Sequence, residues 1–157
     1  MILGHAATAA LGRRLTHAPW AALLLGAFAP DLMDKPLGLL GLTGSRAVGH
    51  TGVMLLAAGL VCLLLIRFHR LRPATALAFL GMWIVHLAGD LAAPRMLFWP
   101  LLGPLPQPSG EGIWAALRGY AFFYLRPDFT RAMFWLDAGC LLAAGLAWWP
   151  ASRRKRV

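Results

Sequence analysis

The sequence predicts an all-α fold: a polytopic membrane helical bundle of about five transmembrane or membrane-embedded helices, plus one interfacial helix. Three observations support this prediction. Hydrophobic residues make up 59% of the 157 residues and charged residues 13%, whereas soluble domains are roughly 45–50% apolar. Segments 51–66, 74–88 and 138–149 carry no charge and approach the roughly 20 residues that cross a bilayer. Basic residues stand at the ends of these segments, where headgroups favour them.

The first half of the chain predicts a helical hairpin, a loop and a long helix. Ala-rich residues 2–15 predict a first helix and residues 19–29 a second, both short enough to require tilting or local thinning of the bilayer. Residues 30–49 are rich in Gly and Pro and predict a loop. A third helix is expected over about 47–68.

The second half predicts a fourth helix over about 73–92, antiparallel to the third. The proline-dense stretch 94–108 and an amphipathic interfacial helix over 111–125 follow, and a last span covers about 129–149. We therefore expect one membrane-embedded domain over residues 1–157, with an outer loop at 94–128 and a basic cytoplasmic tail at 150–157.

The net charge of +9 reflects membrane topology rather than nucleic-acid binding, because the basic residues mark the ends of spans and form no stripe. Nine of the fifteen Lys and Arg residues lie at 13–14, 67–72 and 153–156. With these on the cytoplasmic side, the positive-inside rule predicts five passes with the N-terminus outside and the C-terminus inside.

This topology gathers most of the histidines and half of the acidic residues at the outer ends of the helices. His17 and His69 fall on the opposite face. The outer group comprises His5, Asp31, Asp34, His50, His86 and Asp90. Ionisable groups are costly within a membrane and are generally functional or paired, so the sequence predicts a site there.

The strongest local motif is His86-x-x-x-Asp90, because a spacing of four places both side chains on one helix face. Its alternative explanation is a neutral histidine bonded to a helix neighbour. For Asp31 and Asp34, the alternative explanation is that they only stabilise a turn between two prolines. For His50, the alternatives are that the segment serves helix capping by Thr51 or that the histidine simply lies at the membrane interface. For His5, the alternative is that it belongs to a disordered terminus.

Together these imidazoles and carboxylates form a mixed nitrogen and oxygen set that suits zinc, manganese or iron better than magnesium. A shared ion requires His86 to lie within about 10 Å of His50, since ligand bonds are about 2 Å long. Asp137 and Thr51 are candidates to support the ligand histidines from behind. Asp137 would orient a ligand histidine, or else it is the partner of Arg131 or Arg118.

The sequence resembles the YdjM-type family of membrane-bound metal-dependent hydrolases. The resemblance covers Gly4-His5, GAFAPDLMDKP at 26–36, GSRAVGHTG at 44–52, HLAGD at 86–90 and Trp99-Pro100, about two thirds of the chain in order and spacing. Thr51 departs from the family's usual serine but keeps the hydroxyl. The family is similar in motif logic to zinc-dependent phospholipase C and related nucleases.

The resemblance implies one or two divalent ions, zinc foremost, held by His5, Asp31, His50, His86 and Asp90, in an inner membrane of a bacterium or archaeon. The expected activity is hydrolysis of a phosphoester by an activated water. A lipid-linked phosphoester is one candidate substrate. Asp34 and His50 are expected to be catalytic residues, with Asp34 as general base or second-metal ligand. Lys35, Arg46 and Arg95 are candidates to hold an anionic headgroup, with interfacial anchoring as the alternative.

The competing class is a metal-binding or metal-transporting membrane protein without hydrolytic activity. A transporter is expected to hold its ligands near the bilayer midplane between discontinuous helices, whereas this cluster is predicted toward one face.

Overall fold

The computed structural model describes residues 2–44, 46–89, 94–105 and 131–153, together with residues 114, 118, 121, 122 and 125. Across these residues the regular secondary structure is helical and includes no strand, which confirms the all-α prediction. The elements are α1 (Ile2–Thr16), α2 (Trp20–Leu39), the 3-10 turn η1 (Val48–His50), α3 (Gly52–Arg67), α4 (Pro73–Gly89), α5 (Pro94–Leu97) and α7 (Ala132–Arg153).

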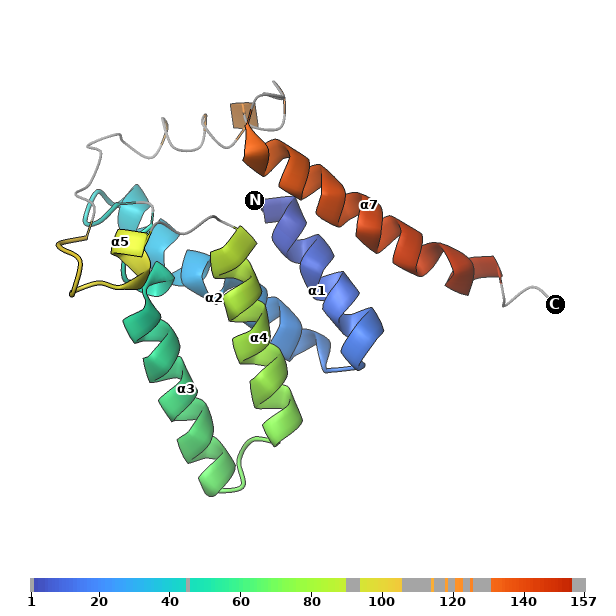
Figure 1. Cartoon of the computed structure of the whole chain (residues 1–157), viewed down its shortest axis with the longest axis horizontal. Helices are drawn as coiled ribbons and strands as arrows, with labels where there is room; N and C mark the ends of the chain where they lie inside the picture. The colour runs from blue at the N-terminus through green and yellow to red at the C-terminus, as the bar shows by residue number, and fades with distance from the viewer. Residues whose placement is uncertain are drawn as a thin grey trace.

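Helix α2 is the centre of the arrangement and contacts α1, α4 and η1 (Figure 1). Helices α3 and α4 run antiparallel and are joined by a tight turn, as predicted. Helix α7 packs along α1. Three separate segments of the sequence, α1, α4 and η1, therefore pack against α2.

Helix α1 forms because its alanines are strong helix formers, and its end has a recognisable cap. His17 adopts a left-handed backbone conformation with φ 55°, and its N–H donates to the Arg13 carbonyl at 3.1 Å. The Arg13 guanidinium donates to the carbonyls of His17 and Ala18 at 2.5 and 2.8 Å. A cation at this end also offsets the helix dipole, so the turn into α2 is well defined.

Helix α2 contradicts the prediction of a loop over 30–49. The helix continues through Pro30 and Pro36 and ends at Leu39. A proline removes one helical hydrogen bond and typically costs about 3 kcal/mol, but packing of α2 against α4 and η1 offsets this cost. Asp31 and Asp34 consequently lie three residues apart on one helix face, and both are buried.

The third helix begins at Gly52, five residues later than predicted. The N–H groups of Ala47 and Gly49 are directed to the buried carboxylate of Asp34, at 2.7 and 2.8 Å, instead of entering a longer helix. Thr51 then caps α3 by accepting from the Met54 N–H at 3.2 Å. His50 is thus held in a short 3-10 turn directly beside α2.

The packing of α2 on α4 depends on small residues. The buried core contains Ala9, Leu23, Ala27 and Met82. A Cβ atom on Gly26 would lie 2.1 Å from the Phe79 carbonyl oxygen, so only glycine permits this approach of the two backbones.

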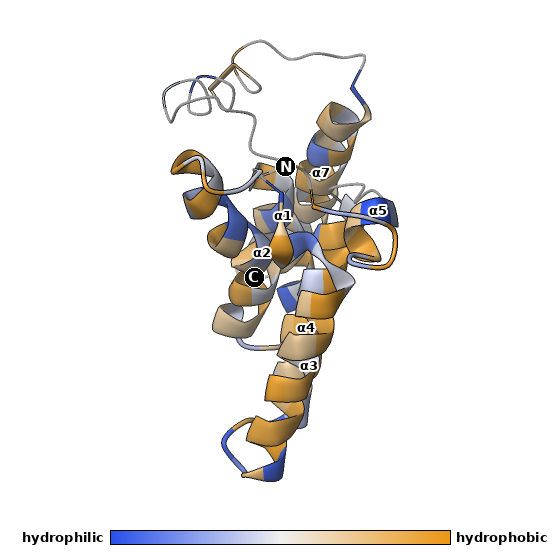
Figure 2. Cartoon of the chain, turned by 90° about the vertical axis from the view of Figure 1, so that its left-hand side faces the viewer, coloured by the Kyte–Doolittle hydropathy of each residue, from blue (hydrophilic) through white to orange (hydrophobic). Residues whose placement is uncertain are grey.

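Only helix α7, over Ala132–Trp149, is long and apolar enough among the described helices to cross a membrane by length and composition. Helices α3 and α4 are apolar but shorter, and α2 includes three charged residues. The five predicted spans are therefore not established by the helices alone. Figure 2 shows the apolar character of α3 and α4, with hydrophilic residues at the turn that joins them.

The remaining predicted elements are only partly described. At residues 114, 118, 121, 122 and 125 of the predicted interfacial helix, the chain is helical and exposed. The other residues of that helix, residues 90–93 at the predicted end of the fourth helix, and residues 154–157 of the basic tail lie outside the described part of the chain.

Candidate metal centre

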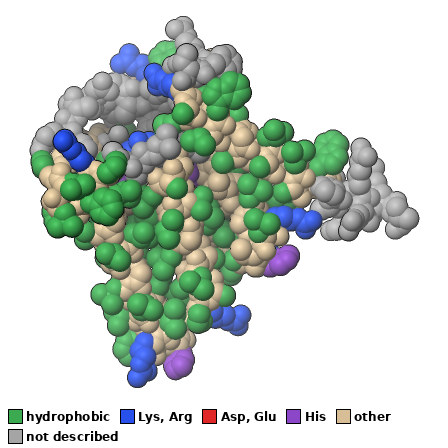
Figure 3. All heavy atoms as spheres, viewed as in Figure 1, with side chains coloured by type: hydrophobic (Ala, Val, Ile, Leu, Met, Phe, Trp, Pro, Cys, Tyr) green, Lys and Arg blue, Asp and Glu red, His purple; other side chains and the backbone are tan. Residues whose placement is uncertain are grey.

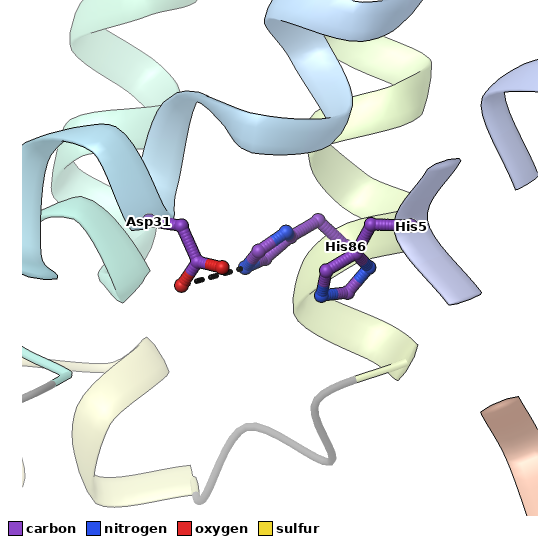
Figure 4. A group of neighbouring side chains, drawn as sticks. All are labelled: His5, Asp31 and His86. Atoms are coloured by element: carbon purple, nitrogen blue, oxygen red, sulfur yellow. Dashed lines mark ion pairs between the residues drawn. The ribbon is translucent and has the colours of Figure 1, made fainter. Parts of the chain in front are cut away.

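Four elements each contribute one potential metal ligand to a buried cluster. His5 comes from α1, Asp31 from α2, His50 from η1 and His86 from α4. The exposed fractions of these residues are 1%, 6%, 0% and 0%. Ligand atoms of His5, Asp31 and His86 all lie within 4.8 Å of one another, and Figure 4 shows the Asp31 carboxylate directed toward the His86 ring, with the His5 ring alongside.

His50 completes the group through its Nε2 atom. The Nε2 atoms of His50 and His86 lie 3.1 Å apart, far inside the 10 Å limit set by the sequence hypothesis. Asp31 Oδ1 lies 3.8 Å from His50 Nε2 and 3.9 Å from His86 Nε2. One carboxylate oxygen and two imidazole nitrogens therefore face a common point.

The proton on His50 is assigned by its contact with Asp34. Both Asp34 oxygens accept backbone N–H groups, from Ala47 and Gly49, so this carboxylate acts as an acceptor. His50 Nδ1 lies 2.7 Å from Asp34 Oδ2 and must be the donor. The neutral His50 ring then has a lone pair on Nε2, which points toward His86.

The proton on His86 is assigned in the same way. His86 Nδ1 lies 2.6 Å from the Ala27 carbonyl oxygen, and a carbonyl can only accept. With its proton on Nδ1, neutral His86 also has a lone pair on Nε2. Two lone pairs thus face each other at 3.1 Å, an arrangement that requires a cation or a shared proton between them.

A divalent ion fits this requirement. Nitrogen ligands at 2.0–2.1 Å in a tetrahedral zinc site lie about 3.3 Å from each other, close to the 3.1 Å that separates the two Nε2 atoms. The Asp31 oxygen would need to approach by roughly half an ångström. Hydrogen bonds from the distal ring nitrogen to a carboxylate or a carbonyl are also typical of metal-ligating histidines.

His5 lies beside the His86 ring. Its ring stacks on the His86 ring with centroids 3.9 Å apart and an interplanar angle of 22°. Phe28 meets His5 edge to face, with centroids 6.3 Å apart. Helix α1 therefore contributes a third imidazole to the cluster.

Two further polar residues position the ligands. Asp137 of α7, which is 4% exposed, accepts a hydrogen bond of 2.5 Å from the Gly4 N–H and so holds the residue before His5. Thr51 donates to the Val48 carbonyl at 2.7 Å while it caps α3. Of the two roles predicted for Asp137, this contact is closer to the orientation of a ligand histidine. Asp137 acts on His5 indirectly, by holding the backbone of α1 at Gly4. The capping alternative described for Thr51 is observed.

The three predicted anion-binding cations differ in position. The Lys35 ammonium forms an ion pair with Asp31, one helical turn before it. The Arg46 guanidinium is half-buried, 4.0 Å from Met133 Sδ, and Arg95 is exposed on α5. Lys35 therefore directly contacts a candidate ligand.

Asp90, the other member of the predicted His86-x-x-x-Asp90 motif, lies outside the described residues. Two contributions were not foreseen: the Ala27 carbonyl that orients His86, and Phe28 beside His5. A main-chain carbonyl has no signature in the sequence. Phe28 is one apolar residue among many.

No protein-family model, no curated protein and no solved structure matches this chain. The resemblance to YdjM-type hydrolases therefore stays a prediction.

Proposed function

We propose that this chain is a membrane-bound, metal-dependent hydrolase that cleaves a phosphoester. The observation that carries the proposal is the pair of Nε2 atoms of His50 and His86, 3.1 Å apart with Asp31 and His5 beside them. Burial of three imidazoles and a carboxylate at one point is costly unless they are paired or coordinate an ion. The resemblance of the surrounding motifs to YdjM-type hydrolases favours the same conclusion.

His5, Asp31, His50 and His86 would hold the ion, zinc foremost, with manganese or iron as alternatives. A divalent ion there would supply Lewis acidity and bring the pKa of water toward neutrality. In the reaction, a water oxygen forms a bond to phosphorus and the P–O ester bond breaks. One proton of the water ends on the leaving alcohol, so the products are an alcohol and a phosphate.

Asp34 takes a different part from the general base expected from the sequence. Its two oxygens are occupied by Ala47, Gly49 and His50. It therefore fixes the His50 ring and its tautomer, and we propose it as a positioning residue. Lys35, next to Asp31, is placed to attract the anionic phosphoester.

The distribution of side chains supports a membrane location. Among the described residues, the buried polar ones are those of the site and its supports, whereas large apolar side chains are exposed, among them Leu56 at 75%, Leu77 at 71% and Leu142 at 65%. Figure 3 shows apolar side chains spread over the whole described part of this face, with Lys, Arg and His at its margins. Soluble monomers rarely expose contiguous apolar patches beyond a few hundred Å², so we propose lipid around α3, α4 and α7.

We also propose that five helices cross or enter a bacterial or archaeal inner membrane. The Arg13-Arg14 turn and the Arg67–Arg72 turn both lie in the lower part of Figure 1, away from α5 and the start of α7. This position supports the proposed positive-inside arrangement, in which the site would lie toward the outer face and the C-terminus in the cytoplasm. Helices α3 and α4, of 16 and 17 residues, would span about 25 Å, so the bilayer would be locally thin.

The test combines metal content with hydrolysis. Detergent-purified protein is analysed by elemental mass spectrometry and assayed on p-nitrophenyl phosphate and bis-p-nitrophenyl phosphate, with and without chelator. We expect about one or two equivalents of divalent metal and hydrolysis that chelation abolishes and re-addition of metal restores. His86→Ala and His50→Ala should lose both. His69→Asn is the matched control, because His69 is exposed and has φ 54°, which asparagine tolerates.

Bound metal without hydrolysis of either ester would favour the metal-binding or transporting alternative. Hydrolysis that survives both chelation and His86→Ala would overturn the proposal.

A further inference from the structure

A groove of about 500 Å³ lies beside the candidate metal centre. Every described residue that lines it belongs to α2, between Leu24 and Leu39. Six of the eight described lining residues are apolar, and the other two are Asp31 and Lys35. The groove is therefore an apolar surface with one charged place along its length.

That charged place belongs to the metal centre. Asp31 and Lys35 both line the groove. The Asp31 carboxylate has Oδ1 3.8 and 3.9 Å from the Nε2 atoms of His50 and His86, and Oδ2 in contact with Lys35. Phe28 lines the groove as well and packs against His5. A molecule in the groove would thus lie against Asp31 and Phe28, two residues next to the histidines of the candidate metal centre.

The apolar wall is accessible from outside the protein. Leu25 and Leu32 are 54% and 62% exposed, and Lys35 is half-buried beside Asp31. The combination is suited to an amphiphile, because the hydrocarbon is held by leucines while the anionic group meets a cation. A small water-soluble ester would leave most of this wall unused.

We propose that the α2 groove binds the hydrocarbon chain of a lipid phosphoester and directs its phosphate to the metal centre at Asp31. The inference rests on the proposed function for its chemistry and names the substrate class. Hydrolysis of such a lipid breaks its P–O ester bond with one water, as above. The chain would remain in an apolar environment throughout, so the substrate would not have to leave the membrane.

Photolabelling tests the groove independently of turnover. The full-length protein in maltoside micelles is irradiated with dodecyl phosphate that carries a diazirine in its alkyl chain, and labelled peptides are mapped by mass spectrometry. We expect labels between Leu24 and Leu39, competed by unlabelled dodecyl phosphate but not by dodecanol. Leu32→Trp, which fills the groove, should reduce labelling about tenfold. Leu56→Trp, at an exposed leucine of α3, should not.

Labels spread evenly over α3, α4 and α7, equal competition by dodecanol, or equal labelling of both variants would overturn the inference. Hydrolysis assays separate this result from the proposed function. Chelator-sensitive hydrolysis of p-nitrophenyl phosphate without specific labelling would support the proposed hydrolase function and refute lipid binding in the groove. Specific labelling without any hydrolysis would support lipid binding in the groove and refute the proposed hydrolase function. Where both succeed, Leu32→Trp should raise KM for dodecyl phosphate and leave that for p-nitrophenyl phosphate unchanged.

Discussion

Replacement of Asp34 by asparagine tests whether the metal centre depends on the tautomer of His50. Asp34 accepts from the N–H groups of Ala47 and Gly49 and from His50 Nδ1. An asparagine side chain has one acceptor oxygen and one donor amide. If its oxygen bonds Gly49, its amide faces His50 Nδ1, which favours the His50 tautomer with the proton on Nε2. That tautomer has no lone pair at Nε2 for an ion.

The expected loss follows from comparable carboxylate–histidine–metal contacts, whose removal typically weakens metal binding 10–100-fold. This corresponds to about 1.4–2.7 kcal/mol. A buried N–H that loses its acceptor adds about 1–3 kcal/mol to the cost of folding. Asp34→Asn should therefore show both weaker metal binding and a lower Tm.

Competition with a chromophoric zinc chelator measures the affinity, and thermal denaturation in detergent measures the stability. Asp137→Asn is the matched control, because Asp137 is also buried but accepts from the Gly4 N–H, which the asparagine oxygen can still accept. An Asp34→Asn protein that folds and binds zinc within about twofold of the original would refute the role assigned to Asp34.

Three other substitutions test the packing that positions the site. Gly26→Ala should destabilise the protein by about 1–3 kcal/mol, because the new Cβ would overlap the Phe79 carbonyl; Gly59→Ala, where no atom lies within 4 Å, should be neutral or stabilising in the same denaturation assay. Thr51→Ala should cost about 1 kcal/mol through loss of the α3 cap, and Thr51→Ser should restore most of it; equal stability of the two variants would contradict the capping role. Asp137→Ala should lower the Tm and weaken zinc binding together, since α1 loses its link to α7 next to the metal centre; a lower Tm with unaltered zinc affinity would separate Asp137 from the site.

The helical class and most helix boundaries were accessible to sequence reasoning because they depend on local composition. Alanines predict α1, and the uncharged stretches predict α3, α4 and α7 within a few residues. The extension of α2 through Pro30 and Pro36 was not accessible. Prolines usually end helices, and only contacts with α4 and η1 show why this helix continues.

The candidate ligands were chosen from residue type and from the expected depth of each helix end. That reasoning assembled His5, Asp31, His50 and His86, and it set aside His17 and His69, which are exposed in the structure. The same reasoning predicted Asp34 as general base or second-metal ligand. The sequence does not contain the information that Asp34 meets the N–H groups of a turn more than ten residues later, which gives it a supporting position instead.

By itself, the sequence determined that this protein is helical and strongly apolar, and it predicted that histidines and aspartates gather at one end of the helical bundle. These properties follow from composition and from spacing along single helices. Only the tertiary structure decided that two Nε2 lone pairs face each other at 3.1 Å, because ring orientation depends on the Asp34 carboxylate behind His50 and the Ala27 carbonyl behind His86. Both contacts join segments far apart in the chain, and such distances are set by packing.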